Sequence, residues 1–204
     1  MSKIKICGVT TLDDIECVNK SRCDYVGFVF AESKRKVSID LALMLKKNLN
    51  KNMLSVGVFV DEDIDFIKRL CDSQIVDVIQ LHGNENSCYI SQIKLITNKP
   101  VIKAFRIRDI NDVKLSIESN ADFLLFDTYD KLSIGGTGKT FDWDLIKGVN
   151  RDYFLAGGLN YDNIPMAYLR LKPFAFDVSS GVESNGAKDC KKISEIVSLV
   201  RSLN

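Results

Sequence analysis

Lys3–Phe30 reads KIKICGVTTLDDIECVNKSRCDYVGFVF and sets the pattern of the whole chain. It opens with a short apolar run, Lys3–Cys7, and closes with a second one, Tyr25–Phe30. Between them, Thr11 and the aspartates that follow it are typical of a helix amino terminus, because threonine caps the first turn and carboxylates favour its positive end. The stretch therefore predicts a strand, a helix and a second strand, the unit from which parallel sheets are built.

The same unit recurs to the end of the chain. Short apolar runs rich in β-branched and aromatic residues alternate with longer stretches of helical periodicity, such as Ile64, Ile67 and Leu70 at three-residue spacing. The eight runs are Lys3–Cys7, Tyr25–Phe30, Ser55–Val60, Val76–Leu81, Val101–Phe105, Phe123–Phe126, Tyr153–Ala156 and Phe174–Val178.

Strands that alternate with helices pair in parallel through right-handed crossovers. Eight such units within 204 residues favour a closed (β/α)8 barrel, the TIM barrel, over an open doubly wound sheet. No linker or composition shift divides the sequence, so we expect one barrel domain over residues 1–204. In such a barrel the functional side chains lie where the strands end.

Composition excludes several classes of function. Hydrophobic residues make up 46% of the chain and charged residues 27%, and the formal net charge is +1. A chain so balanced carries no general electrostatic attraction for nucleic acid or for an anionic membrane, so we expect neither partner. The first residues lack an apolar core of signal-peptide length, and no stretch approaches a membrane span, which favours a cytoplasmic protein.

The cysteine and histidine content restricts the chemistry further. The chain has six cysteines and one histidine, His82, and no C-x-x-C pair. Zinc binding and a disulfide framework are therefore not expected, and the cysteines are expected to be reduced thiols. With a single histidine available, acid–base catalysis is expected to fall to carboxylates and a thiol.

Two of the run ends predict a phosphate site. Gly157 and Gly158 end the seventh run, and Ser179, Ser180 and Gly181 end the eighth. Barrels often bind phosphate between the loops that follow strands seven and eight, where glycine lets backbone N–H groups approach the anion. The alternative is that these glycines only form turns, which is their commonest role.

The glycine-rich segment after the sixth run, with Gly135, Gly136 and Gly138, resembles a nucleotide-binding loop only superficially. The motif G-x-x-x-x-G-K-[ST] requires glycine at position 133, and Ser133 stands there. The segment is instead interpreted as a flap over the site that supplies N–H donors, with a plain flexible connector as the alternative.

Four further side chains sit at run ends. Cys7 ends the first run, although free cysteine is often a buried apolar residue. Asp127 follows a strongly apolar run that removes it partly from water, which suits general acid chemistry, whereas capping a turn is the alternative. Arg35 follows the second run and is placed to form a bidentate pair with a substrate carboxylate, whereas a solvated loop charge is the alternative. His82 is a lone histidine, which is most often a structural residue and only sometimes a ligand or a catalyst.

The motifs of the chain, taken in order, resemble those of the phosphoribosylanthranilate isomerases of tryptophan biosynthesis. The resemblance extends from residue 3 to about residue 200. Its motifs are Lys5-Ile6-Cys7-Gly8, Gly27-Phe28-Val29-Phe30, Ser33-Lys34-Arg35, Val56-Gly57-Val58-Phe59, Gln80-Leu81-His82-Gly83, Phe126-Asp127-Thr128, Gly135 to Trp143, Ala156-Gly157-Gly158-Leu159 and Asp177 to Glu183.

The resemblance implies an Amadori rearrangement of N-(5-phosphoribosyl)anthranilate to 1-(2-carboxyphenylamino)-1-deoxyribulose 5-phosphate, without a metal or an organic cofactor. By the same resemblance, Cys7 corresponds to the general base and Asp127 to the general acid. Arg35, His82 and Asp177 correspond to substrate-contacting positions. The implied partner is this small phosphosugar-anthranilate substrate, and the implied assembly is a monomer or a homodimer.

The thiol raises a question of its own, because free cysteine is mostly protonated at neutral pH. Lys5 lies two residues before Cys7 in the same run and so on the same face of a strand. We therefore hypothesise that the positive charge of Lys5 lowers the pKa of Cys7.

Two alternative functions remain at this point. Other phosphosugar barrels, such as indole-glycerol-phosphate synthase and the isomerase of histidine biosynthesis, share the phosphate loops. By family resemblance the first is expected to carry a catalytic lysine and the second an aspartate pair, rather than Cys7 with Asp127. A binding barrel without activity would be expected to have lost the acid or the base.

Overall fold

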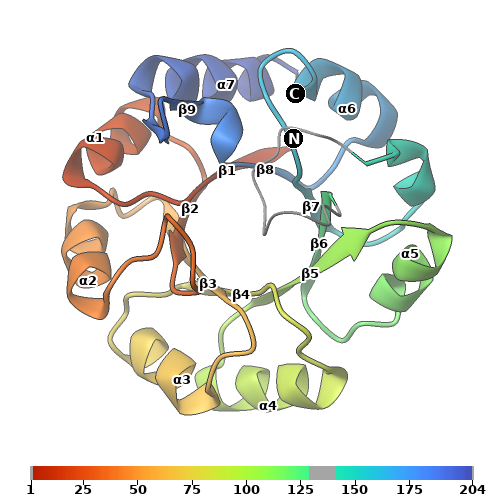
Figure 1. Ribbon diagram of the computed structural model, residues 1–204, viewed down its shortest axis with the longest axis horizontal. Helices are drawn as coiled ribbons and strands as arrows, with labels where there is room; N and C mark the ends of the chain where they lie inside the picture. The colour runs from red at the N-terminus through yellow and green to blue at the C-terminus, as the bar shows by residue number, and fades with distance from the viewer. Residues whose placement is uncertain (1, 129–140, 204) are drawn as a thin grey trace.

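A computed structural model describes residues 2–128 and 141–203, and its strands close into a parallel barrel in the order β1-β2-β3-β4-β5-β6-β7-β8. Figure 1 looks down the barrel, with the strands in an inner ring and the helices outside it. The strands are β1 (Lys3–Cys7), β2 (Tyr25–Val29), β3 (Leu54–Phe59), β4 (Val78–Leu81), β5 (Val101–Ile107), β6 (Phe123–Thr128), β7 (Tyr153–Leu155) and β8 (Ala175–Val178). The predicted fold class and all eight runs are thus confirmed, with ends shifted by at most two residues.

The helices follow the strands as the periodicity predicted, with one exception. The α-helices are α1 (Leu12–Ser21), α2 (Ile39–Asn48), α3 (Ile64–Asp72), α4 (Ser87–Thr97), α5 (Ile110–Ile117), α6 (Ile164–Leu171) and α7 (Cys190–Ser202). Thr11 caps α1 as predicted: its side chain accepts the N–H of Asp14, whose own side chain accepts the N–H of Thr11. Between β6 and β7 the described residues contain only the 3-10 turn η1 (Trp143–Ile146), and Gly148, with a φ of 88°, follows it.

A small hairpin lies between β8 and the last helix. After β8 come the 3-10 turn η2 (Ser180–Val182) and the two short antiparallel strands β9 (Glu183–Ser184) and β10 (Ala187–Lys188). Asp189 then caps α7 with its side chain. The hairpin therefore connects the end of the barrel to the last helix within a few residues.

The core consists of two apolar clusters, one between the strands and the helices and one inside the barrel. The larger cluster joins the strands to the helices, as Ile6 and Ile196 illustrate, and both of these side chains are buried. The smaller cluster contains strand residues and no helix residue, among them Val56, Leu125 and Phe154. Because side chains alternate along a strand, this second cluster fills the inside of the barrel.

The expectation of reduced cysteines is wrong at one pair. Cys17 of α1 and Cys190 of α7 form a disulfide, although 173 positions separate them in the sequence. Figure 1 shows why spacing along the chain could not reveal the pair: barrel closure brings the first and last helices side by side. The free cysteines of the described residues are Cys7, Cys23, Cys71 and Cys88.

Candidate active site

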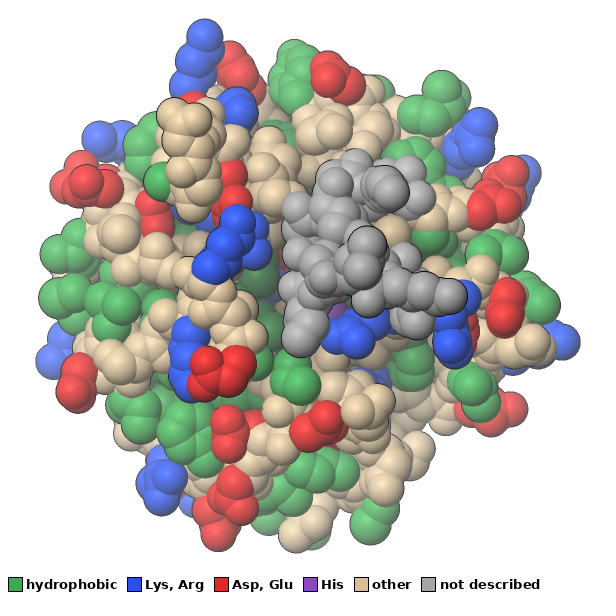
Figure 2. Space-filling model, viewed as in Figure 1, with side chains coloured by type: hydrophobic (Ala, Val, Ile, Leu, Met, Phe, Trp, Pro, Cys, Tyr) green, Lys and Arg blue, Asp and Glu red, His purple; other side chains and the backbone are tan. Residues whose placement is uncertain are grey.

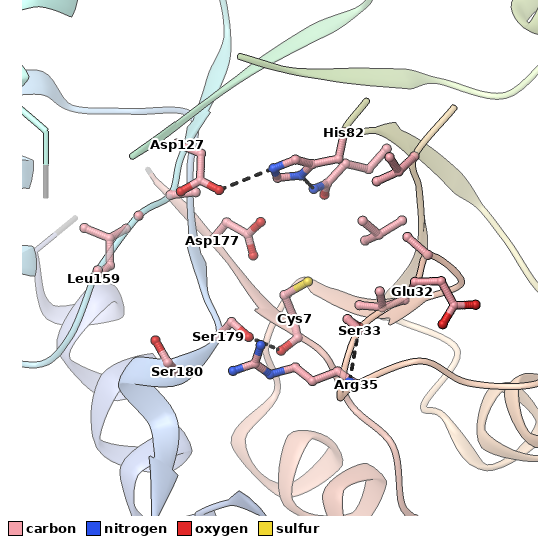
Figure 3. Close-up of a pocket in the computed structure, with 18 residues that line it drawn as sticks. Cys7, Glu32, Ser33, Arg35, His82, Asp127, Leu159, Asp177, Ser179 and Ser180 are labelled. Carbon is pink, nitrogen blue, oxygen red and sulfur yellow. Dashed lines mark hydrogen bonds and ion pairs between the residues drawn. The ribbon is translucent and has the colours of Figure 1, made fainter. Parts of the chain in front are cut away.

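A cavity opens where the strands end, and most of the predicted residues line it. Figure 3 shows these side chains converging from different strands. The lining residues that the sequence singled out are Cys7, Arg35, His82, Asp127, Gly157, Gly158, Asp177, Ser179 and Ser180. Gly181 lies behind this wall: a Cβ there would come within 2.0 Å of the Leu159 carbonyl oxygen, so glycine allows the loops after β7 and β8 to touch. The predicted flap glycines Gly135, Gly136 and Gly138 fall outside the described residues.

Cys7 stands at the end of β1 with its sulfur in the cavity (Figure 3). Gly27 on the neighbouring strand makes room for it, since a Cβ there would lie 2.7 Å from Cys7 Sγ. Burial has the largest influence on the pKa of the Cys7 thiol and raises it, and the charge of Asp177 acts in the same direction. The charges of Lys5 and Lys188 lower this pKa, but the net result is a raised value. The hypothesis about Lys5 thus has the right direction, but burial outweighs the lysine.

Lys5 is fully buried and paired at the centre of the barrel mouth. Its ammonium lies 2.7 Å from Asp177 Oδ2 and 2.8 Å from Gln80 Oε1. Burial alone would lower the pKa of Lys5, but the charges of Asp177 and Cys7 raise it, so the ammonium form is maintained. The other oxygen of Asp177, Oδ1, is buried and accepts no hydrogen bond from the residues described. This leaves one acceptor ready for a hydroxyl group in the cavity.

Asp127 is the penultimate residue of β6, and both of its carboxylate oxygens have a partner. Oδ1 accepts the backbone N–H of Thr128 at 2.7 Å, and Oδ2 lies 3.3 Å from Nε2 of His82. Gly157 keeps this corner open, because a Cβ there would come within 2.2 Å of Thr128 Oγ1 and 2.9 Å of Asp127 Oδ1. The structure therefore brings His82 to the predicted acid.

Arg35 reaches the cavity over Gly8, where a Cβ would lie 2.3 Å from the arginine Cδ. Its Nε and Nη2 donate to the two carboxylate oxygens of Glu183 at 2.7 and 3.0 Å. Lys188 donates to the same carboxylate at 3.0 Å. Burial would raise the pKa of Glu183, but Arg35 and Lys188 lower it to about 2, so the carboxylate stays ionised. Glu183 thus occupies one bidentate edge of Arg35, the one formed by Nε and Nη2.

The two expected phosphate loops lie side by side at the cavity wall. Gly157 and Gly158 adopt φ values of 84° and 64°, a region that favours glycine. The Ser179 hydroxyl donates to the Cys7 carbonyl oxygen at 3.0 Å, so it also ties the loop after β8 to the end of β1. Lys188 Nζ donates to the Ser179 carbonyl oxygen, which places a cation behind this loop.

Sequence reasoning assigned no role to Glu183, Lys188 or Gln80. Glu183 and Lys188 sit on the β9–β10 hairpin, where the sequence resembles an ordinary charged loop. Their near-complete burial is what distinguishes them, with side chains 9% and 2% exposed. Only the closure of the barrel, which lays the hairpin beside Arg35, gives them a place in the site.

Two kinds of feature are absent from the described residues. Among residues 2–128 and 141–203, no group of three or more His, Cys, Asp or Glu side chains is arranged to hold a metal ion. No helix in this part of the chain is long and apolar enough to span a bilayer. Figure 2 shows basic and acidic side chains intermixed around the face that carries the loops.

A closed parallel barrel with a thiol, a carboxylate and two glycine-containing loops at its strand ends defines a (β/α)8-barrel enzyme. Comparison with known proteins identifies which one: residues 4–199 match the family model of N-(5'-phosphoribosyl)anthranilate isomerase, and the chain belongs to that family. It is thus an isomerase of tryptophan biosynthesis, as the order of its motifs predicted.

Three comparisons illustrate the relationship. The N-(5'-phosphoribosyl)anthranilate isomerase of Endomicrobium trichonymphae is 48% identical over 204 residues, covering all of both chains. The crystal structure of the Thermotoga maritima enzyme superposes with a TM-score of 0.90 at 36% identity, covering 99% of this chain and 100% of the other. A family structure solved with reduced 1-(o-carboxyphenylamino)-1-deoxyribulose 5-phosphate has a TM-score of 0.85 at 33% identity and the same coverage.

Proposed function

We propose that this chain isomerises N-(5'-phosphoribosyl)anthranilate with Asp127 as general acid and Cys7 as general base. The observation that carries this assignment is that both side chains, from β6 and β1, face the same cavity. A neutral carboxylic acid and a thiolate are the two groups that the rearrangement requires, and the chain needs no metal or organic cofactor to supply them.

The proposed reaction begins with two proton transfers and ends with a tautomerisation. Asp127 protonates the ribose ring oxygen as the bond between C1 and that oxygen breaks, which gives an open-chain iminium ion. The Cys7 thiolate then removes the proton from C2, and the electron pair of that C–H bond forms the enolamine. Tautomerisation of the enolamine to the ketone completes the rearrangement, with a proton returning to C1 and no net change in redox state.

Binding in this proposal divides among the remaining cavity residues. The phosphate is held by the loops of Gly157, Gly158, Ser179, Ser180 and Gly181, supported by the positive φ values of the first two. Asp177 Oδ1 accepts a hydrogen bond from a sugar hydroxyl, supported by its buried and unpaired state among the described residues.

Arg35 meets the anthranilate carboxylate in this proposal. Because Glu183 occupies Nε and one N–H of Nη2, the interaction uses the remaining donors, the two N–H groups of Nη1 and the second N–H of Nη2. His82 contacts the substrate beside Asp127. A cytoplasmic location, one domain over residues 1–204, and a monomeric or homodimeric state belong to the same proposal, and sedimentation of the purified chain measures the last of these.

An isomerase assay on freshly generated N-(5'-phosphoribosyl)anthranilate tests the assignment. Asp127→Asn is expected to lose about 10²- to 10⁴-fold in kcat, which is the contribution of a general acid. Cys7→Ser is expected to lose a comparable amount, because a serine hydroxyl is much harder to deprotonate than a thiol. Cys88→Ser, which changes an exposed cysteine, is the matched control and is expected to keep full activity. Full activity in either of the first two variants would overturn the roles.

A further inference from the structure

Four side chains connect the buried centre of the site to the proposed acid. Lys5 Nζ donates to Gln80 Oε1 at 2.8 Å, Gln80 Nε2 lies 3.0 Å from His82 Nδ1, and His82 Nε2 lies 3.3 Å from Asp127 Oδ2. Figure 3 shows the His82 ring between its two dashed contacts. The proposed reaction makes no use of Gln80, which is 1% exposed on β4.

Lys5 determines which way the Gln80 amide points. An ammonium group has three donors and no acceptor, so it faces the carbonyl oxygen of the amide and not its NH₂. Lys5 is completely buried, and its pairing with Asp177 maintains the charge of its ammonium group. This ammonium group therefore cannot donate to water in place of Gln80. The NH₂ group of Gln80 therefore faces His82.

The orientation of this amide determines the state of the imidazole. Because Gln80 donates, Nδ1 of His82 must accept, and a neutral ring that accepts at Nδ1 carries its proton on Nε2. An imidazolium or an Nδ1–H ring would place one donor against another inside the barrel. The remaining N–H of His82 therefore donates to Asp127.

We propose that Gln80 is a positioning residue: it holds His82 as the Nε2–H tautomer so that His82 donates to Asp127. The inference rests on the proposed role of Asp127 as general acid. A lone pair on Nε2 would accept the proton of Asp127 and draw it away from the cavity. An N–H group there leaves that proton to the substrate and stabilises the carboxylate that remains after transfer.

The single histidine of the chain makes the tautomer directly measurable. In protein labelled with ¹⁵N-histidine, the shifts of the two nitrogens of this one imidazole are recorded at about pH 8, and they show which nitrogen carries the proton. The wild type is expected to carry the proton on Nε2. Gln80→Glu replaces the donor with an acceptor of the same shape, so the proton is expected on Nδ1. Gln80→Met removes both groups and is expected to give a mixture of tautomers.

Activity of the same samples links the tautomer to the reaction. Gln80→Glu is expected to lower kcat by about tenfold or more, a part of what a general acid contributes, with a smaller change in KM. A wild-type ring protonated on Nδ1 would overturn the proposal, and this result needs no variant that folds. An unmoved proton in Gln80→Glu would also overturn it, as would a moved proton with unchanged kcat.

A wrong assignment of the general acid would be revealed by a different result from a wrong assignment of the tautomer. If Asp127→Asn keeps full activity, the acid role is lost, and the nitrogen shifts of the Gln80 variants still report whether the amide sets the tautomer. The two ideas are thus separated by one set of samples.

Discussion

Replacing Lys5 by methionine removes the only positive charge within hydrogen-bonding distance of the Asp177 carboxylate among the described residues, while keeping a side chain of similar length. Asp177 would then lie buried with neither oxygen paired, since Oδ2 contacts Lys5 at 2.7 Å and Oδ1 has no donor in the described chain. Removing one partner of a buried ion pair costs about 3–5 kcal/mol in the free energy of unfolding. For a chain of 204 residues this corresponds to a fall in Tm of about 10 °C.

The same substitution is expected to change the reactivity of Cys7. The Lys5 charge favours the thiolate, so its loss raises the Cys7 pKa beyond the already raised value. The rate of alkylation at Cys7 is followed against pH by mass spectrometry of the Cys7 peptide, because Cys88 is exposed and also reacts. In Lys5→Met the midpoint is expected at higher pH than in the wild type.

A second buried lysine provides the matched control. Lys103 pairs with Glu85 at 3.0 Å, with side chains 6% and 1% exposed, and does not line the cavity of Cys7. Lys103→Met is therefore expected to lose a similar stability and to leave the Cys7 midpoint unchanged. An unchanged midpoint in Lys5→Met, or an equal shift in both variants, would refute the electrostatic link between Lys5 and the thiol.

Three further substitutions test separate parts of the site and fold. Glu183→Gln weakens the bidentate interaction with Arg35 and is expected to raise KM several-fold with little change in kcat. Steady-state kinetics measures both parameters, and a fall in kcat alone would contradict this expectation. Gly157→Ala puts a Cβ 2.2 Å from Thr128 Oγ1 at a positive φ, so loss of activity and a lower Tm are expected. Cys17→Ser opens the disulfide and is expected to cost up to about 5 kcal/mol of unfolding free energy, from the loop of 173 positions, and to abolish any effect of reductant on denaturant unfolding.

The strands and most of the residues that line the cavity could be predicted because their signals are local. Each apolar run is bounded by polar or glycine residues, and parallel pairing brings all run ends to the same edge of the barrel, so Cys7 and Asp127 could be placed before any contact was known. The Cys17–Cys190 disulfide could not be predicted, because it depends on how the first helix packs against the last.

Glu183 escaped prediction for a related physical reason. A charged residue in a loop is usually solvated, and only burial beside Arg35 and Lys188 makes it an obligatory partner. The direction of the net pKa shift of Cys7 could not be predicted either. The sequence shows that a lysine is near the thiol, but it does not show how far the fold removes the thiol from water.

The raised pKa of Cys7 also determines the pH dependence of the proposed reaction. Catalysis requires a thiolate at Cys7 and a proton on Asp127 in the same molecule, and the thiol is the group that burial drives to higher pKa. The thiolate fraction rises with pH up to the Cys7 pKa and is complete above it, so Cys7 sets a break in the pH profile of kcat/KM at its own pKa. We therefore expect this break to coincide with the alkylation midpoint of Cys7, and Lys5→Met to move both upward together. A break that stays in place while the midpoint moves would show that another group, and not Cys7, is the base.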